Sequence, residues 1–202
     1  DIKPVEGRLE SIGNIKNNSK VILDYAHTPD ALKYTLKSIK EQFSHSSISI
    51  VFGCGGDRDK DKRPIMGKIA NQYCNKIFLT DDNPRYENPK KIRKQIKKKI
   101  VRSKLVEIAS RKKAIKAAIE NLNSGDILLV AGKGHEIYQE HKGKKKIFSD
   151  KKYILKEINS KNKKLFKNWK ANILNEKCNL GLVNKKLKIN KASINSKNIK
   201  KN

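Results

Sequence analysis

The stretch KIFLTDDNPRYENPKKI, residues 76–92, contains the pattern from which the fold follows. Its second to fourth residues, Ile-Phe-Leu, are a short apolar run typical of a buried β-strand. A polar loop comes next, and Asn88 and Pro89 then supply the capping side chain and the first-turn proline that favour the start of a helix. The stretch therefore predicts a strand, a polar loop and a helix in direct succession.

The same succession recurs along the first three quarters of the chain. Apolar runs predict strands at residues 21–26, 47–53, 105–109 and 126–132, and 3.6-residue periodicity predicts helices at 28–43, 62–74, 88–101, 110–122 and 149–158. A hairpin is expected within residues 136–150. Continuous apolar strands that alternate with helices predict an α/β, Rossmann-like fold, with a mainly parallel sheet covered by helices on both faces.

The composition changes after residue 158. Residues 151–202 contain sixteen lysines and two acidic residues. We therefore expect an α/β domain over residues 1–158, followed by a lysine-rich, basic tail or linker over residues 159–202. Apolar residues do recur in the second part, at Leu165, Phe166 and Trp169.

The net charge of +28 first suggests a nucleic-acid partner. Lysine greatly outnumbers arginine, isoleucine and asparagine are also abundant, and the basic stretches carry few aromatic residues. This composition reflects AT-rich codons better than a nucleic-acid-binding surface, so we expect no nucleic-acid partner. The three cysteines lie far apart and indicate reduced thiols in a cytoplasmic protein.

No apolar run approaches the length of a membrane span, so none is expected. The chain begins without Met and without an apolar leader segment, and we expect it to begin inside a longer protein.

Four of the predicted strands run directly into polar clusters. The clusters are DYAHTPD, CGGDRDKDKRP, TDDNPR and GKGHE. Because ligands of open parallel sheets bind at the carboxyl ends of the strands, we expect these four loops to share one crevice.

The residue types in these loops predict an amino acid as ligand. Arg58 and Arg85 offer planar forks suited to a carboxylate, and Asp82 and Glu136 can accept an ammonium group. Glycines that allow close backbone approach are Gly53, Gly55, Gly56, Gly132 and Gly134. The alternative is that the two arginines form surface ion pairs with Asp57, Asp59 or Asp81.

No phosphate-binding P-loop is present in the 202 residues, because no Gly-Lys pair is followed by Ser or Thr. His27 and His135 lack a Ser or Cys nucleophile at useful spacing. For these histidines we favour ligand contact over proton transfer.

These loops resemble the Mur ligases of peptidoglycan synthesis, in the carboxy-terminal domain of the members that add diaminopimelate. The matching stretches are PVEGRLE, DYAHTPDAL, VFGCGGDRDKDKRPIMG, TDDNPR, DILLVAGKGHEIYQ and FSD, which cover roughly residues 1–158. The resemblance implies that the amino acid meso-diaminopimelate is held by Arg58, Asp82, Asn83, Pro84, Arg85, Gly132 and Glu136. It also implies that Asp24, Tyr25 and His27 lie towards the nucleotide.

The resemblance further implies the chemistry of the intact protein. ATP, with Mg²⁺, phosphorylates the D-glutamate side chain of a UDP-linked muramoyl dipeptide, and the amine of diaminopimelate then displaces phosphate. The P-loop and the metal ligands belong to preceding domains, so we expect this chain to hold no catalytic residue and no metal, and to be inert alone. A non-catalytic module that binds an amino acid or an anion is the alternative. Residues 166–202 also resemble the start of a D-alanyl-D-alanine-adding Mur ligase, with Asn195 and Lys197 in place of the usual Asp and Arg.

Overall fold

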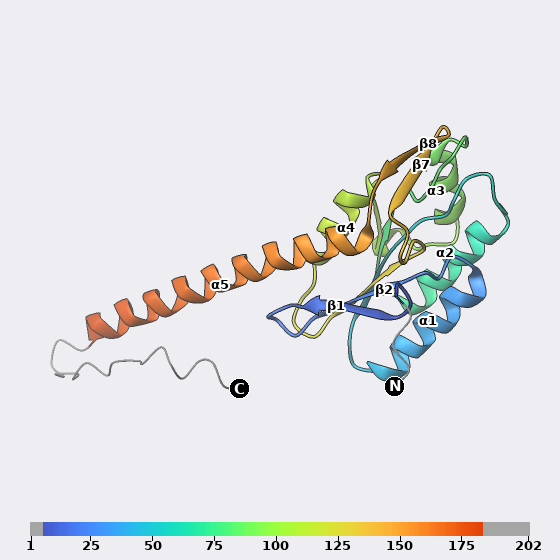
Figure 1. Ribbon diagram of the computed structural model, residues 1–202. Coiled ribbons are helices and arrows are strands. Elements are labelled where there is room, and N and C mark those ends of the chain that lie inside the picture. Colours follow the sequence, from blue (N-terminus) through green and yellow to red (C-terminus); the bar gives the residue numbers. More distant parts are fainter. Residues whose placement is uncertain (1–5, 184–202) are drawn as a thin grey trace, which may run out of the picture. The chain divides into compact units, whose positions relative to one another are not determined.

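The structure is a computed structural model that describes the backbone of residues 6–183 and the side chains of residues 6–173. Its central sheet has six strands in the order β1-β2-β6-β3-β4-β5 (Figure 1). The strands are β1 (Glu10–Asn14), β2 (Lys20–Asp24), β3 (Ile48–Phe52), β4 (Lys76–Leu79), β5 (Leu105–Glu107) and β6 (Ile127–Ala131). Strands β2 to β6 pair in parallel, which confirms the predicted mainly parallel α/β sheet.

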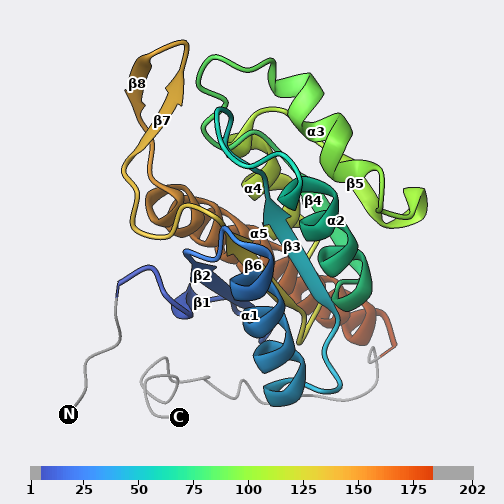
Figure 2. The same cartoon turned by 90° about the vertical axis from the view of Figure 1, so that its right-hand side faces the viewer.

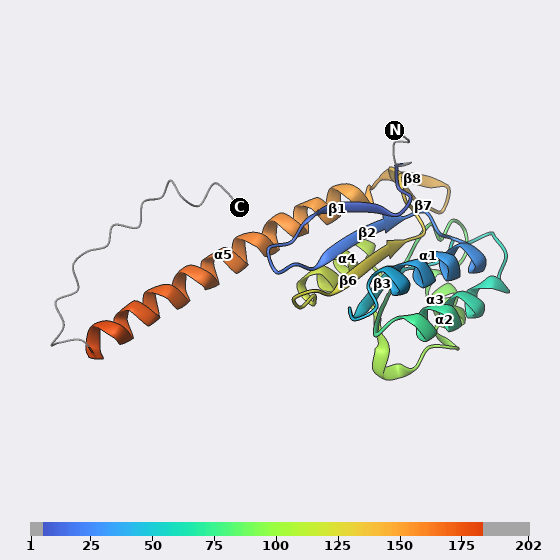
Figure 3. The same ribbon diagram turned by 90° about the horizontal axis from the view of Figure 1, so that it is seen from below.

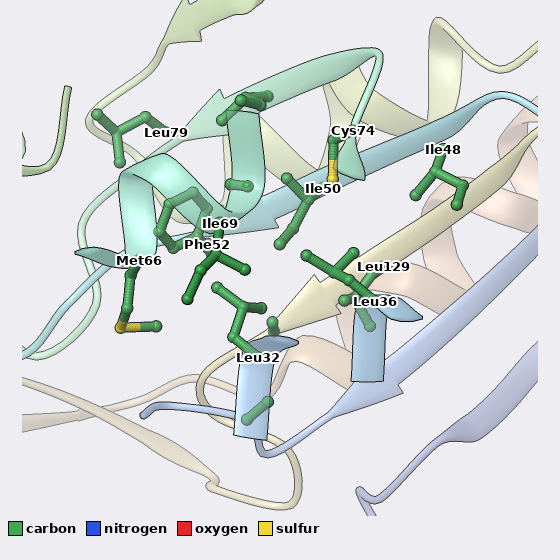
Figure 4. Packing of buried hydrophobic residues seen from close by; sticks show 14 of the residues in the cluster. Leu32, Leu36, Ile48, Ile50, Phe52, Met66, Ile69, Cys74, Leu79 and Leu129 are labelled. Atoms are coloured by element: carbon green, nitrogen blue, oxygen red, sulfur yellow. The ribbon is translucent and has the colours of Figure 1, made fainter. Parts of the chain in front are cut away.

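Three helices cover one face of the sheet: α1 (Pro29–Gln42), α2 (Lys62–Tyr73) and α3 (Pro89–Lys97). They lie together on the same side of the strands (Figures 2 and 3). Leu32 and Leu36 of α1 and Met66 of α2 belong to one buried cluster with Phe52 of β3 and Leu129 of β6 (Figure 4). Removing this apolar surface from water is the main stabilising contribution on this face.

The other face is covered by α4 (Arg111–Glu120) and by the beginning of α5 (Asp150–Val183). Strand β6 contributes apolar side chains to the buried clusters on both faces of the sheet. Leu129 belongs to the first cluster, whereas Leu128 and Val130 pack with Ile115 of α4 and Ile154 of α5. Two buried faces explain why the strand reads as a continuous apolar run rather than as an alternating one.

The predicted helix starts are confirmed. The Thr28 hydroxyl accepts a hydrogen bond from the Ala31 amide, and the Asn88 side chain accepts one from the Lys90 amide. Helix α3 ends at Lys97, four residues earlier than predicted, and a short 3₁₀ helix at Arg102–Lys104 leads into β5.

Strand β1 was not predicted from the sequence. It pairs antiparallel with β2 at the edge of the sheet, with a register shift between Ser11 and Asn14. The run ESIGN holds a single buried apolar residue, Ile12, so periodicity gave no strand signal.

The predicted hairpin is present as β7 (Tyr138–His141) and β8 (Lys144–Ile147), which form a separate two-stranded sheet. Helix α5, expected to end at residue 158, continues to Val183, so the expected boundary falls inside one helix. One compact unit of the chain ends at Leu165, and a second begins at Phe166. The stretch 194–202 that resembles a second ligase lies outside the described residues. No described helix has the length and apolar character needed to cross a bilayer.

Candidate functional site

A cavity of about 500 Å³ lies at the carboxyl ends of β2, β3, β4 and β6. All four predicted loops contribute to it, so the prediction of one shared crevice is confirmed. The lining residues are Tyr25, His27, Thr28, Pro29, Gly53, Cys54, Gly55, Arg58, Asp59, Lys62, Asp82, Asn83, Arg85, Gly132, Glu136 and Tyr138.

The loop after β4 places Asp82 at the floor of this cavity. One carboxylate oxygen, Oδ1, accepts a hydrogen bond of 2.7 Å from the Asn83 amide. The other, Oδ2, is buried without a hydrogen-bond partner among the described residues and lies 3.8 Å from Nη1 of Arg111. A buried carboxylate oxygen that lacks a hydrogen-bond donor is a costly arrangement, and the charge of the Arg111 guanidinium is what faces it here.

Arg85 is held in the left-handed region, with φ of 49°. Its Nη1 atom donates to the carbonyl of Gly56 at 2.7 Å, and its Nε atom lies 3.5 Å from Oε2 of Glu140. Backbone strain of this kind is concentrated at ligand sites. The Arg85 side chain is half-buried and lines the cavity.

Pro84 does not line the cavity. It is buried, and its carbonyl accepts the Glu87 amide at 3.0 Å. A Cβ added at Gly56 would lie 2.0 Å from that carbonyl, so only glycine allows the two loops to meet there. Pro84 thus shapes the loop that carries its neighbours.

The loop after β6 contributes Gly132 and Glu136, which both line the cavity. Oε2 of Glu136 accepts from Nδ2 of Asn83 at 3.0 Å and from Nζ of Lys133 at 2.8 Å. Lys133 is fully buried and also donates to Oδ1 of Asn83 at 2.9 Å. This triad fixes one oxygen of Glu136, and its other oxygen, Oε1, is not part of these contacts.

The loop after β3 is anchored by the buried Arg63, whose guanidinium donates to both carboxylate oxygens of Glu87 and to the Gly55 carbonyl. Arg63 lowers the pKa of Glu87 to about 2, chiefly through these side-chain hydrogen bonds. The loops after β3 and β4 are thereby linked. Arg58 is exposed, and its Nη1 donates to the backbone carbonyl of Asp57 at 3.0 Å.

The predicted site residues in the loop after β2 have two different roles, since two of them line the cavity and one holds the loop in place. Tyr25 and His27 line the cavity. Asp24 does not: it is buried, and its carboxylate accepts from the Leu9 and Ala26 amides and from the Thr35 hydroxyl. These contacts orient the loop and the edge of the sheet.

The alternative of surface ion pairs with Asp57, Asp59 or Asp81 is wrong for Arg85, whose acidic partner is Glu140. Asp81 pairs with Arg93 instead. Within the described side chains, Arg58 forms no ion pair, so its guanidinium is available at the rim of the cavity.

Sequence reasoning missed several residues of the site. Lys62 donates to the His27 carbonyl from the first turn of α2, and Tyr138 enters from β7. Cys54 lies at the floor, where burial raises the pKa of its thiol to about 12, so it remains protonated at neutral pH. Cys54 and Lys62 lie within the predicted CGGDRDKDKRP loop and could have been found from their position, whereas Tyr138 lies outside the four predicted loops.

The chain matches the family model described as Mur ligase, glutamate ligase domain, over residues 7–134. It is 48% identical over 156 residues to a UDP-N-acetylmuramoyl-L-alanyl-D-glutamate–2,6-diaminopimelate ligase of Rickettsia felis, covering 77% of this chain and 29% of that protein. The protein of the same name from Buchnera aphidicola is 49% identical over 162 residues, covering 80% and 32%. The chain thus spans about a third of the length of these relatives.

A solved structure of a ligase of this name superposes with a TM-score of 0.71 at 41% identity, covering 79% of this chain and 32% of that one. A folylpolyglutamate synthase of Mycobacterium tuberculosis, at 16% identity, a TM-score of 0.53 and coverage of 64% and 30%, shares the fold. Since the family model matches more than half of the chain, and the matched residues build the four loops of the cavity, the chain belongs to the Mur ligase family, with its glutamate ligase domain over residues 7–134.

Proposed function

We propose that this chain is the amino-acid-binding part of an ATP-dependent ligase that adds meso-2,6-diaminopimelate to UDP-N-acetylmuramoyl-L-alanyl-D-glutamate. The observation that carries the proposal is that the cation Arg85 and the carboxylates Asp82 and Glu136 line one cavity. Side chains of both charges around one cavity suit a zwitterionic amino-acid centre. The names of the relatives at 48–49% identity support the same substrate.

In this proposal Arg85 and Arg58 bind the distal carboxylate of diaminopimelate, a group that lysine lacks. Asp82 and Glu136 accept the distal ammonium, and Gly132 leaves room for it beside Asp82, since its absent Cβ would lie 3.2 Å from Oδ2. Asn83 and Pro84 hold these side chains in place. Tyr25 and His27 face the nucleotide side of the cavity, and Asp24 positions them.

The reaction proposed for the intact ligase forms one amide bond. ATP transfers its γ-phosphoryl group to the D-glutamate side-chain carboxylate and leaves as ADP. The diaminopimelate amine then attacks the carbonyl carbon of the acyl phosphate and loses a proton, and phosphate leaves with the electrons of the broken C–O bond. The described residues include no cluster of three His, Cys, Asp or Glu side chains that could hold a metal ion. As the family resemblance implies, we assign ATP and Mg²⁺ mainly to residues outside this chain, and assign to it the binding and orientation of the amine substrate.

A chimeric ligase tests this proposal. The matching third of the Rickettsia felis relative would be replaced by residues 6–158 of this chain, and amide formation would be assayed with meso-diaminopimelate and with L-lysine. The proposal predicts turnover with a strong preference for diaminopimelate, whereas the chain alone should neither hydrolyse ATP nor form amides. A chimera that is folded and binds UDP-linked dipeptide and ATP, yet uses no amino acid, would favour a non-catalytic binding module.

A further inference from the structure

The second strand pair of the fold, the β7–β8 hairpin, lies beside the loop that carries Arg85 (Figures 1 and 2). The backbones are joined directly: the Arg85 amide donates to the Glu140 carbonyl at 3.2 Å, and the Lys142 amide donates to the Arg85 carbonyl at 2.7 Å. The Glu140 amide in turn donates to Oδ1 of Asn83 at 3.0 Å. Hydrogen bonds of its main chain therefore hold Glu140 against the loop that carries Asn83 and Arg85, independently of the Glu140 side chain.

The Glu140 carboxylate has one charged partner among the described residues, which is Arg85. Oε2 lies 3.5 Å from Nε, longer than the 2.7–2.9 Å typical of a charge-assisted hydrogen bond. Both side chains retain a fifth of their accessible surface. This ion pair is loose, and its loss would leave the hairpin's backbone contacts in place.

The side of the Arg85 guanidinium at which the Glu140 carboxylate lies matters more than the strength of the ion pair. Nη1 of Arg85 is already bonded to the Gly56 carbonyl. A bidentate carboxylate that avoids this bond needs the edge formed by Nε and Nη2. Glu140 lies at the Nε side of that edge, so an incoming carboxylate and Glu140 compete for the same donors and repel each other.

We propose that Glu140 is an internal competitor that neutralises Arg85 while the site is empty, and that it sets how strongly the site distinguishes diaminopimelate from lysine. This inference rests on the proposed function. With Glu140 present, Arg85 stays paired with Glu140 when lysine binds. Lysine therefore loses little affinity by lacking a distal carboxylate. Without the Glu140 charge, the distal carboxylate of diaminopimelate binds Arg85 with no competing anion. When lysine binds instead, Arg85 has no anionic partner and lies near the lysine ammonium.

Glu140→Gln tests the proposal, because it keeps the shape of the side chain and removes its charge. The whole chain would be titrated with meso-diaminopimelate and with L-lysine, and dissociation constants would be read from amide chemical shifts. We expect diaminopimelate to bind roughly tenfold more tightly to the variant and lysine to bind less tightly than to the unmodified chain. Glu41→Gln, which removes an exposed carboxylate paired with Lys37 on α1, is the matched control and should change neither constant.

The outcomes separate this inference from the proposed function. If the unmodified chain binds neither amino acid, the proposed function fails and the inference with it. If the unmodified chain prefers diaminopimelate but Glu140→Gln weakens that binding, Glu140 orients Arg85 rather than competing for it, and the inference alone is overturned. Unchanged constants in the variant would also overturn it.

Discussion

Oδ2 of Asp82 and Nη1 of Arg111 face each other at 3.8 Å, and neither atom has a hydrogen-bond partner among the described residues. Arg111 is fully buried and is held by Asp150, which accepts from Nε at 2.8 Å and from Nη2 at 2.6 Å. Burial opposes its charge, but Asp150 and then Asp82 raise its pKa overall. Arg111 is thus a fixed, buried cation beside Asp82, and it faces the buried oxygen Oδ2 of that carboxylate.

Asp82→Asn should weaken diaminopimelate binding by about ten- to a hundredfold, because it removes a negative charge from the lining of the cavity. The side chain can still accept from the Asn83 amide through Oδ1, and Arg111 keeps Asp150, so the melting temperature should change little. Calorimetric titration and thermal unfolding of the same sample measure both effects. Unchanged affinity with a large loss of stability would show that Asp82 is structural only.

Glu87→Gln should destabilise the fold, because it removes the carboxylate that pairs with the buried Arg63. Breaking a buried pair in this way costs roughly 3 kcal/mol in the free energy of unfolding. The folded-state pKa of Glu87 is lowered to about 2 from its ordinary 4.5, so its stabilisation is present above pH 4.5 and is lost as the pH falls towards 2.

Urea unfolding at pH 7 and at pH 2.5 measures this difference. The gap between the unmodified chain and Glu87→Gln should be widest at pH 7 and should shrink at pH 2.5. Glu41→Gln is again the control, since its i,i+4 pair with Lys37 is exposed and should contribute at most about 0.5 kcal/mol. A gap for Glu87→Gln that is independent of pH would contradict the assigned ion pair.

Gly56→Ala should separate the loops after β3 and β4, since its Cβ would lie 2.0 Å from the Pro84 carbonyl. The displaced carbonyl belongs to the residue before Arg85, so diaminopimelate binding should fall by at least tenfold. Gly125→Ala is the comparison: φ of 77° strains the substituted backbone, but nothing lies within 4 Å of its Cβ, and Gly125 does not line the cavity. Equal effects of the two variants on ligand affinity would show that general destabilisation of the fold, and not the lost contact between the two loops, is responsible.

Much of the fold could be predicted because its signals are local. Strand β6 reads as a continuous apolar run because both of its faces are buried, and α1 and α3 begin at a capping side chain followed by proline. Strand β1 could not be predicted, because its pairing with β2 depends on backbone hydrogen bonds that leave no apolar pattern. The end of α5 was missed because the lysine-rich composition after residue 158 indicated a tail, whereas Lys161 donates to three carbonyls at the end of α4.

The site was partly predictable for a different reason. Polar clusters at strand ends identify the four loops, because the parallel topology brings those ends to one edge. Contacts between residues far apart in the sequence could not be predicted from the spacing of residues within a motif. Glu140 lies 55 positions after Arg85 in the chain, and Lys133 bonds to Asn83 across 50 positions.

The most direct test of the central claim, that Arg85 recognises the distal carboxylate of diaminopimelate, is the affinity of this chain for meso-diaminopimelate and for L-lysine, before and after Arg85→Ala. Losing a charge-assisted bidentate contact costs on the order of 2–4 kcal/mol, so diaminopimelate should bind about 30- to 1000-fold more weakly. Lysine binding should change by less than about threefold, since lysine has no carboxylate to lose, and Arg85→Lys should restore little of the loss. Equal losses for the two amino acids would contradict the account and would make the loop from Asp82 to Arg85 a structural turn.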